Sequence, residues 1–238
     1  MPPAANVRFV DCRDRDAYLA GHIPGAAHAD PESDLTGTDG GGRHPLPTAE
    51  AFAAWASAAG IGPGTLVVGY DAGATGWAAR LWWLLRHFGH DLAGAIAFDA
   101  WRGPLATGEE RIEPQAFVAR PRTDDTADAA ELLRRLGEPG LVLVDARAPE
   151  RYRGEVEPID RIAGRIPGAR NAYYVEPLPA GLTRADELVV YCGSGVTACV
   201  DVLALTLAGR DDVRLYPGSW SEWSELGHPV EVGPLEAG

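Results

Sequence analysis

The sequence is poor in basic residues, in cysteine and in long apolar runs, and each shortage argues against certain classes of function. Its 21 basic residues stand against 34 acidic ones, which gives a formal net charge of −13. Such a field repels phosphate backbones and anionic lipid, so we expect neither nucleic acid nor a membrane surface as a partner. No apolar run approaches the roughly 18 residues that a membrane span needs.

The three cysteines, Cys12, Cys192 and Cys199, are too few for a disulfide framework and lack the paired spacing of metal ligands. We therefore expect reduced thiols, no metal site and no cofactor. The first residues show no basic segment followed by an apolar core, so no signal peptide is predicted. The cytoplasm is the compartment that we expect, because thiols stay reduced there.

An internal repeat organises the chain. Each half contains, in order, an apolar strand ending in Asp-x-Arg, an Ile-Pro-Gly-Ala turn, a second apolar strand and a helical segment. In the first half these are residues 7–13, 23–26, 66–71 and 77–88, and in the second half residues 141–147, 166–169, 188–192 and 196–207. Short Val/Leu runs that alternate with helical patterns are typical of parallel strands buried on both faces.

A polar, proline-containing stretch at residues 119–126 separates the halves, as a linker would. The sequence therefore predicts two domains, 1–122 and 123–238. Each is expected to be an α/β fold with a mainly parallel sheet flanked by helices. In the second domain, Asp128 is predicted to cap a helix over residues 129–136.

Cys192 leaves the second strand of the second half and enters a loop that reads Cys-Gly-Ser-Gly-Val-Thr. Two glycines in four residues permit a tight turn, and the next helix is expected from about Val196. Inward-pointing N–H groups and a helix N-terminus form an anion-binding nest, which favours a nucleophilic thiolate. The alternative is a buried core cysteine. Asp71 at the matching position of the first half argues against it, because the fold needs no thiol there.

The loop lacks the arginine that a cysteine-dependent phosphatase would need. A Cys-x5-Arg loop would hold a phosphate, because the arginine supplies the bidentate partner that phosphate requires. Ala198 stands where that arginine would be.

These motifs resemble those of the tandem-domain rhodanese family, in the branch of thiosulfate and 3-mercaptopyruvate sulfurtransferases. The likeness covers nearly the whole chain and includes both Ile-Pro-Gly-Ala turns, residues 80–90, residues 151–158 and, most specifically, the Cys192 loop. The resemblance implies two rhodanese-like domains. The C-terminal one would carry a persulfide on Cys192, and the N-terminal one would be inactive with Asp71 in its place.

The residues after the cysteine bear on the donor. In the family, Gly-Ser-Gly at this place, here Gly193-Ser194-Gly195, accompanies use of 3-mercaptopyruvate, whereas basic residues accompany thiosulfate. The resemblance also implies that Arg151 holds the donor's carboxylate, with Arg161 as the candidate for a second arginine despite a shortened spacing. The loop residues expected to bind the substrate are Gly193, Gly195, Val196 and Thr197.

Arg151 lies in a cluster of arginines with Arg147, Arg153, Arg161 and Arg165. Taken singly, each is compatible with a solvated or salt-bridged surface position. Their concentration in an acidic protein favours an anion site for at least one of them, and Arg151 is the first choice.

A serine–histidine–acid relay of the mercaptopyruvate branch matches Ser194, His44 and either Glu32 or Asp30. The choice between the two acids stays open. Considered alone, His44 also suits a surface histidine, and Ser194 a small residue that bonds the local backbone. Cys12 and Cys199 are expected to be core residues.

The function predicted is a sulfurtransferase that moves sulfur from 3-mercaptopyruvate to a thiophilic acceptor through a Cys192 persulfide. A small anionic donor and an acceptor such as thioredoxin or a small thiol are the expected partners. Two alternatives remain: a thiosulfate sulfurtransferase, and a rhodanese-like module that binds or carries persulfide without turning over a small donor.

Overall fold

The chain folds into two compact units in the computed structural model, which describes residues 6–234. Among the described residues, one unit comprises 6–38 and 46–122, and the other comprises 39–45 and 123–234. The chain passes from one unit to the other after residue 122, within the stretch read as a linker. The short segment 39–45 belongs to the second unit, although it precedes the predicted boundary at residue 123. A single boundary in the sequence cannot describe this arrangement.

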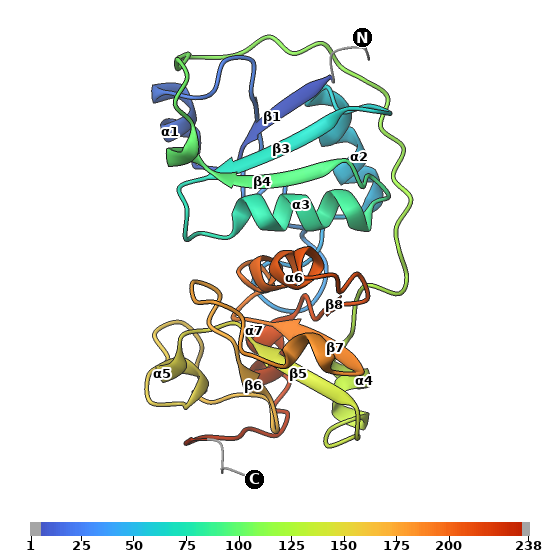
Figure 1. Ribbon diagram of the computed structural model, residues 1–238, viewed down its shortest axis with the longest axis vertical. Helices are drawn as coiled ribbons and strands as arrows, with labels where there is room; N and C mark the ends of the chain where they lie inside the picture. The colour runs from blue at the N-terminus through green and yellow to red at the C-terminus, as the bar shows by residue number, and fades with distance from the viewer. Residues whose placement is uncertain (1–5, 235–238) are drawn as a thin grey trace. The chain divides into compact units, whose positions relative to one another are not determined.

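The first unit is built on a four-stranded parallel sheet in the order β2-β1-β3-β4 (Figure 1). Helix α3 packs against β3 and β4. The elements are β1 (Val7–Asp11), α1 (Arg15–Ala20), β2 (Ala27–His28), α2 (Ala49–Ala58), β3 (Leu66–Asp71), α3 (Trp77–His87), β4 (Ala93–Ala97) and the 3₁₀ helix η1 (Phe98–Ala100).

The second unit repeats this plan with a parallel sheet in the order β6-β5-β7-β8, and α6 packs on β7 and β8. The predicted α/β class with two parallel sheets is confirmed. The elements are α4 (Ala129–Arg134), β5 (Leu141–Asp145), α5 (Pro149–Tyr152), β6 (Arg170–Asn171), the 3₁₀ helix η2 (Leu182–Arg184), β7 (Glu187–Tyr191), α6 (Ala198–Leu207), β8 (Arg214–Leu215) and α7 (Ser219–Glu225).

The repeat seen in the sequence recurs in the hydrogen bonds. Arg147 forms a fork on Asp145 at the end of β5, with Nη2 2.6 Å from Oδ2, and Nη2 also donates to the Gly164 carbonyl. In the first unit, Arg13 pairs with Asp11 in the same way and donates to the carbonyl of the glycine before its own Ile-Pro-Gly-Ala turn. A guanidinium thus links each first strand to the loop that follows it.

The Ile-Pro-Gly-Ala turns are fastened to the central strands. Tyr191 of β7 accepts a hydrogen bond at its hydroxyl from the Ile166 N–H, at 3.1 Å. Tyr70 of β3 accepts one from the Ile23 N–H at the same distance. The turn motif is therefore fastened to the strand that ends at Asp71 or at Tyr191.

Two helices differ from their predicted limits. The helix expected from Val196 begins at Ala198, because Gly195 adopts a φ of +77° and the residues after it complete the loop. The helix expected over residues 129–136 ends at Arg134. Its cap is as predicted, since the Asp128 carboxylate accepts the Glu131 N–H at 2.7 Å.

The core of the second unit lies behind the carboxyl end of β7. Tyr191, Trp220 and Trp223 are fully buried there, together with Leu132 and Ile166. Burial of one such large side chain contributes roughly 1.5–3 kcal/mol. The aromatic rings thus hold the end of β7 rigidly, at the point where Cys192 begins.

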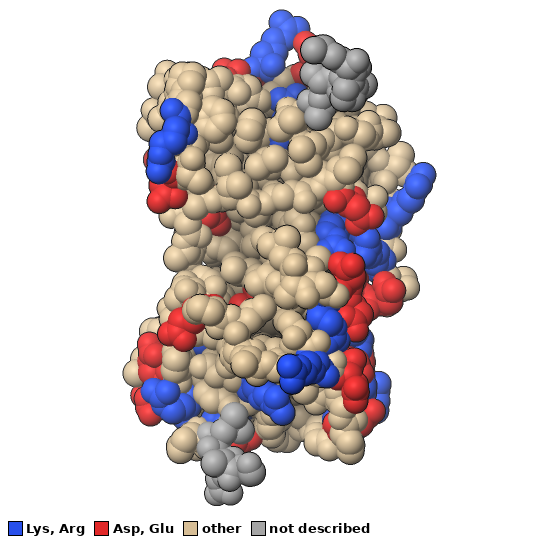
Figure 2. Space-filling view, viewed as in Figure 1, with Lys and Arg blue, Asp and Glu red and all other residues tan. Residues whose placement is uncertain are grey.

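Acidic side chains and arginines are interspersed on the face that Figure 2 shows, and the sequence contains no lysine. Within residues 6–234, none of the helices has the length and apolarity needed to cross a membrane.

Candidate active site

Cys192 lies directly after β7 and is 1% exposed. The Gly195 N–H points at its sulfur, with a nitrogen-to-Sγ distance of 3.1 Å. A Cβ at position 195 would collide with the Pro217 carbonyl, and the φ of +77° is one that residues with side chains rarely adopt. Glycine is therefore required for the turn that brings a backbone donor to the sulfur.

The first turn of α7 holds the loop from behind. The Cys192 N–H donates to Ser219 Oγ at 3.1 Å, and the Trp220 and Ser221 N–H groups donate to the carbonyls of Cys192 and Gly193, each at 3.0 Å. Ser219 adopts a φ of 54°, a costly backbone conformation that the surrounding bonds must impose. Sequence reasoning missed these anchors.

Ser194 and His44, which the family resemblance places in one relay, lie in contact. Ser194 Oγ lies 2.7 Å from His44 Nδ1, and the Ser194 side chain is largely buried. The backbone of the neighbouring Arg43 donates to Ser221 Oγ at 3.1 Å, which fixes the segment that carries the histidine. Ser194 is two residues after Cys192, so this hydroxyl–imidazole pair can move a proton near the sulfur.

The acid of the relay stays a prediction. Asp30 accepts the N–H groups of Glu32 and Ser33 at Oδ1, each at 3.0 Å, so its carboxylate organises its own turn. Asp30 and Glu32 both belong to the first unit, whereas His44 belongs to the second.

Arg151, on α5, approaches the loop residue after the cysteine. A Cβ at Gly193 would lie 3.6 Å from both terminal nitrogens of Arg151. The same guanidinium forms a fork on Glu157, at 2.6 and 3.2 Å, and lies 3.6 Å from Asp160 Oδ2. Its side chain keeps 18% exposure, so a small anion can reach it.

The other clustered arginines are held by carboxylates. Arg147 is buried between Asp145 and Glu157, and Arg153 pairs with Glu155 at 2.8 Å. Arg165 is fully buried, pairs with Glu231 and stacks on Tyr152. The predicted cluster is thus mainly structural.

Arg161, the predicted second arginine, is exposed and lines the wall of a cavity of about 640 Å³. Val196 is buried, and Thr197 immediately precedes α6. Contacts of Arg161, Val196 and Thr197 with a donor remain predictions.

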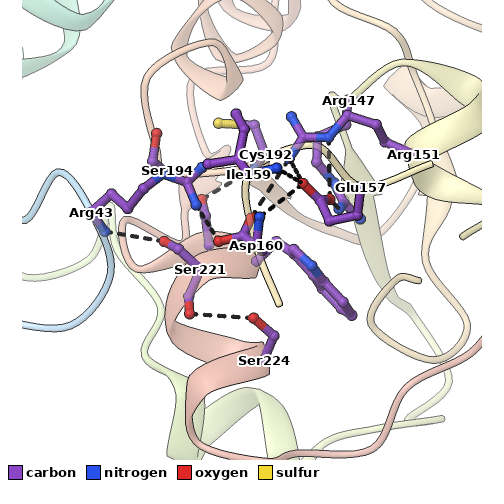
Figure 3. A network of polar contacts seen from close by, with 12 residues as sticks. Arg43, Arg147, Arg151, Glu157, Ile159, Asp160, Cys192, Ser194, Ser221 and Ser224 are labelled. Carbon is purple, nitrogen blue, oxygen red and sulfur yellow. Dashed lines mark hydrogen bonds and ion pairs between the residues drawn. The ribbon is translucent and has the colours of Figure 1, made fainter. Parts of the chain in front are cut away.

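One arginine that sequence reasoning missed comes from segment 39–45. Arg43 forms an ion pair with Asp160, and Figure 3 shows Asp160 between Arg43 and Arg151. A Cβ at Gly193 would lie 2.9 Å from Arg43 Nη2. The signal in the sequence was its position, because Arg43 immediately precedes the predicted site residue His44.

The acids between these arginines differ in their pKa values. Burial raises the pKa of Asp160, and the neighbouring Glu157 charge adds to this against the pull of Arg43 and Arg151. Burial also acts on Glu157, but hydrogen bonds from Arg151 and from the Asp160 backbone hold its pKa below the usual value. Glu157 is thus the firm anionic partner and Asp160 the weaker one.

In the first unit a carboxylate fills the place of the thiol. Asp71 ends β3, as Cys192 follows β7, and accepts the Gly73 and Ala78 N–H groups at 2.8 and 3.0 Å. The Thr75 hydroxyl donates to it at 2.8 Å. This nest is occupied by the protein's own anion.

The remaining thiols are buried. Burial raises the pKa of the Cys12 thiol, and the charges of Asp71 and Asp11 add to the effect. Cys199 donates from Sγ to the Gly195 carbonyl at 3.3 Å. Within residues 6–234, no cluster of three His, Cys, Asp or Glu side chains is arranged to hold a metal ion.

Asp201 on α6 should make stability depend on pH. Burial, with the charge of Asp145 as a smaller cause, raises its pKa to about 8. The folded chain therefore binds a proton that the unfolded chain has released, so stability falls as the pH rises from about 4 to about 8. Asp201→Asn should remove this cost and raise the free energy of unfolding by a few kcal/mol at pH 8, since one pKa unit is about 1.4 kcal/mol.

Urea denaturation of both proteins at pH 5 and pH 8 measures the effect. We expect a much larger gain for Asp201→Asn at pH 8 than at pH 5. An equal gain at the two pH values would mean that Asp201 does not titrate in this range.

The comparisons with known proteins agree with this geometry. The family model for the rhodanese-like domain matches residues 2–101 and 128–226. A protein of Pseudomonas aeruginosa named "Probable 3-mercaptopyruvate sulfurtransferase" is 44% identical over 91% of this chain and 86% of its own.

Two solved structures are similar over most of the chain. SseA from Escherichia coli, described as a 3-mercaptopyruvate sulfotransferase with the rhodanese fold, is 28% identical with a TM-score of 0.74, and the match covers 91% of this chain and 93% of that one. A "Probable Thiosulfate Sulfurtransferase" is 30% identical with a TM-score of 0.66, over 97% of this chain and 99% of that one. The chain therefore belongs to the rhodanese family and carries two rhodanese-like domains in tandem.

Proposed function

We propose that this chain is a sulfurtransferase that moves the sulfur of 3-mercaptopyruvate to a thiol acceptor through a persulfide on Cys192. The observation that carries the proposal is the backbone hydrogen bond from Gly195 to the Cys192 sulfur, with the Ser194–His44 pair beside it. A persulfide anion in this loop would meet a donor already in place, which lowers the energy of the charge that develops there.

The first half-reaction forms the persulfide and releases pyruvate. The Cys192 thiolate attacks the sulfur of the donor, the S–S bond forms, and the C–S bond breaks with its electron pair on carbon. The proton of the donor thiol passes to that carbon, which leaves pyruvate and a Cys192 persulfide anion. Ser194 and His44, 2.7 Å apart, are suited to take this proton from sulfur and return it to carbon.

The second half-reaction returns the enzyme to its starting state. A thiol acceptor attacks the outer persulfide sulfur, and the S–S bond to Cys192 breaks with its electron pair on the cysteine. The acceptor leaves as a persulfide. We propose a small thiol or thioredoxin for this step, in a reducing compartment such as the cytoplasm, where Cys12, Cys192 and Cys199 would stay free as they are in the structure.

The two domains divide the work in this proposal. Residues 123–238, with segment 39–45, form the catalytic part, because the cysteine loop, Arg151 and His44 all lie in this unit. The first domain is inactive, since Asp71 fills its nest with a carboxylate that three donors hold.

Donor preference separates this proposal from thiosulfate transfer. Thiosulfate is a dianion with no thiol proton to move, and it gains from cations in the loop. This loop offers Gly193, Ser194 and Gly195 instead of basic residues. We expect kcat/KM for 3-mercaptopyruvate to exceed that for thiosulfate by roughly tenfold or more.

Replacing His44 with alanine checks the same point. His44→Ala should lower the 3-mercaptopyruvate rate more than the thiosulfate rate, because only the first donor needs a proton moved. Steady-state kinetics with each donor and one common thiol acceptor measure both effects. Thiosulfate as the better donor would reverse the donor assignment, and no turnover with either donor would favour a persulfide-carrying module.

A further inference from the structure

We propose that Arg43 supplies the second guanidinium group of the donor-carboxylate site, facing Arg151 across Gly193, with Asp160 as the resident carboxylate that the donor displaces. The inference deepens the proposed function and rests on it. It assigns to segment 39–45, which already carries His44, a role in selecting donors that bear a carboxylate.

Both guanidinium groups lie over the residue next to the nucleophile. A Cβ at Gly193 would be 2.9 Å from Arg43 Nη2 and 3.6 Å from both terminal nitrogens of Arg151. Glycine at this position lets Arg43 lie against the backbone next to Cys192, because a side chain would force the arginine to shift. A donor carboxylate that reaches both guanidinium groups can accept hydrogen bonds from each of them.

Arg43 is held in place by its backbone as well as by its charge. The Arg43 N–H donates to Ser221 Oγ at 3.1 Å. A Cβ at Gly42 would lie only 2.8 Å from the same Ser221 oxygen, so the segment sits tightly on the first turn of α7. Figure 3 shows Arg43 extending from this anchor toward Asp160.

Asp160 occupies the stretch where the family resemblance led us to look for an arginine. The N–H groups of Ile159 and Asp160 both donate to Glu157 Oε1 at 3.2 Å, and this turn directs the Asp160 carboxylate toward Arg43. Arg161, one residue later, is exposed. The cation that pairs with Asp160 from another part of the chain is Arg43.

Asp160 holds the two arginines together but also competes with the donor for them. It forms an ion pair with Arg43, and its Oδ2 lies 3.6 Å from Arg151. Its side chain is 9% exposed, so its carboxylate is the anion that an incoming donor carboxylate must partly displace. The two partners of this ion pair should therefore affect donor binding in opposite directions.

The first test compares KM for 3-mercaptopyruvate. Arg43→Ala should raise KM roughly ten- to a hundredfold with a smaller change in kcat, since a charge-assisted contact is lost at the carboxylate. Arg43→Lys should recover only part, because an ammonium lacks the fork. The matched control is Arg153→Ala, which removes another arginine of the same unit, one that pairs with the exposed Glu155.

The second test uses Asp160→Asn, which removes the negative charge and keeps the shape. A donor-binding role for Arg43 predicts a KM for 3-mercaptopyruvate that is unchanged or up to about tenfold lower. A purely structural ion pair predicts that Asp160→Asn and Arg43→Ala raise KM alike. Equal increases would overturn the proposal, as would a large increase in Arg161→Ala with none in Arg43→Ala.

A donor without a carboxylate separates this inference from the proposed function. Inorganic hydrodisulfide, HSS⁻, can give its outer sulfur to the Cys192 thiolate and leave as HS⁻. Mass spectrometry should show wild type and Arg43→Ala forming the persulfide equally well from it. Equal loading with unequal KM for 3-mercaptopyruvate supports the role of Arg43. A loss of loading from both donors in Arg43→Ala would show a damaged loop and overturn it, whereas failure of wild type with both donors would overturn the persulfide itself.

Discussion

Cys192→Ser should abolish turnover, with a loss of roughly a thousandfold or more in the rate of pyruvate release from 3-mercaptopyruvate. A hydroxyl is a poor nucleophile toward sulfur at neutral pH, and loss of a covalent nucleophile commonly costs this much. The Gly195 N–H would still point at the side chain, so the loop should keep its shape. Substantial turnover by a folded Cys192→Ser protein would place the nucleophile elsewhere.

The other two thiols give matched controls. Cys199 is buried seven residues further along and donates to the Gly195 carbonyl, a bond that a serine hydroxyl can also make. Cys12 is buried in the first unit. Cys199→Ser and Cys12→Ser should therefore stay within a few-fold of wild type. A folded Cys199→Ser protein that lost only the acceptor step would assign Cys199 a part in sulfur release.

Arg151→Ala should lower kcat/KM for 3-mercaptopyruvate roughly ten- to a hundredfold, because a charge-assisted and bidentate contact is worth about 1.5–3 kcal/mol. Arg147 also contacts Glu157, at 3.2 Å, so that carboxylate keeps a cationic partner when Arg151 is removed. Arg151→Lys should restore only part of the loss, since a point charge cannot reproduce the fork.

Thermal unfolding of each variant is the control for this result. Arg151→Ala should keep a melting temperature within a few degrees of wild type while its kinetics change. Unchanged kinetics in the folded variant would mean that the anionic end of the donor does not bind Arg151. If kcat/KM and the melting temperature both fell strongly, Arg151 would instead be needed for the stability of the fold.

The fold could be predicted because its information is local and repeated. Apolar runs that end in Asp-x-Arg, followed by Ile-Pro-Gly-Ala, occur twice, and each feature makes the same bonds in both units. The cysteine loop could also be predicted, because two glycines after a strand permit the positive φ that a tight turn needs. Ser194 and His44 were found only through the family resemblance, since 150 residues separate them.

The charge pairing could not be predicted, because it depends on which distant side chains face each other. Five clustered arginines suggested an anion site, yet Arg147 and Arg165 are buried against carboxylates. Segment 39–45 lies in the middle of the first half of the sequence but folds with the second unit. Arg43 therefore approaches Gly193 across 150 residues of chain, with no periodicity to reveal it.

One measurement tests the central claim most directly: the intact mass of the protein after brief mixing with 3-mercaptopyruvate in the absence of an acceptor thiol. The account predicts a gain equal to one sulfur atom, mapped by peptide analysis to Cys192 and removed on addition of a small thiol. A protein that releases pyruvate while its mass stays unchanged, or that carries the added sulfur on Cys12 or Cys199, would contradict it.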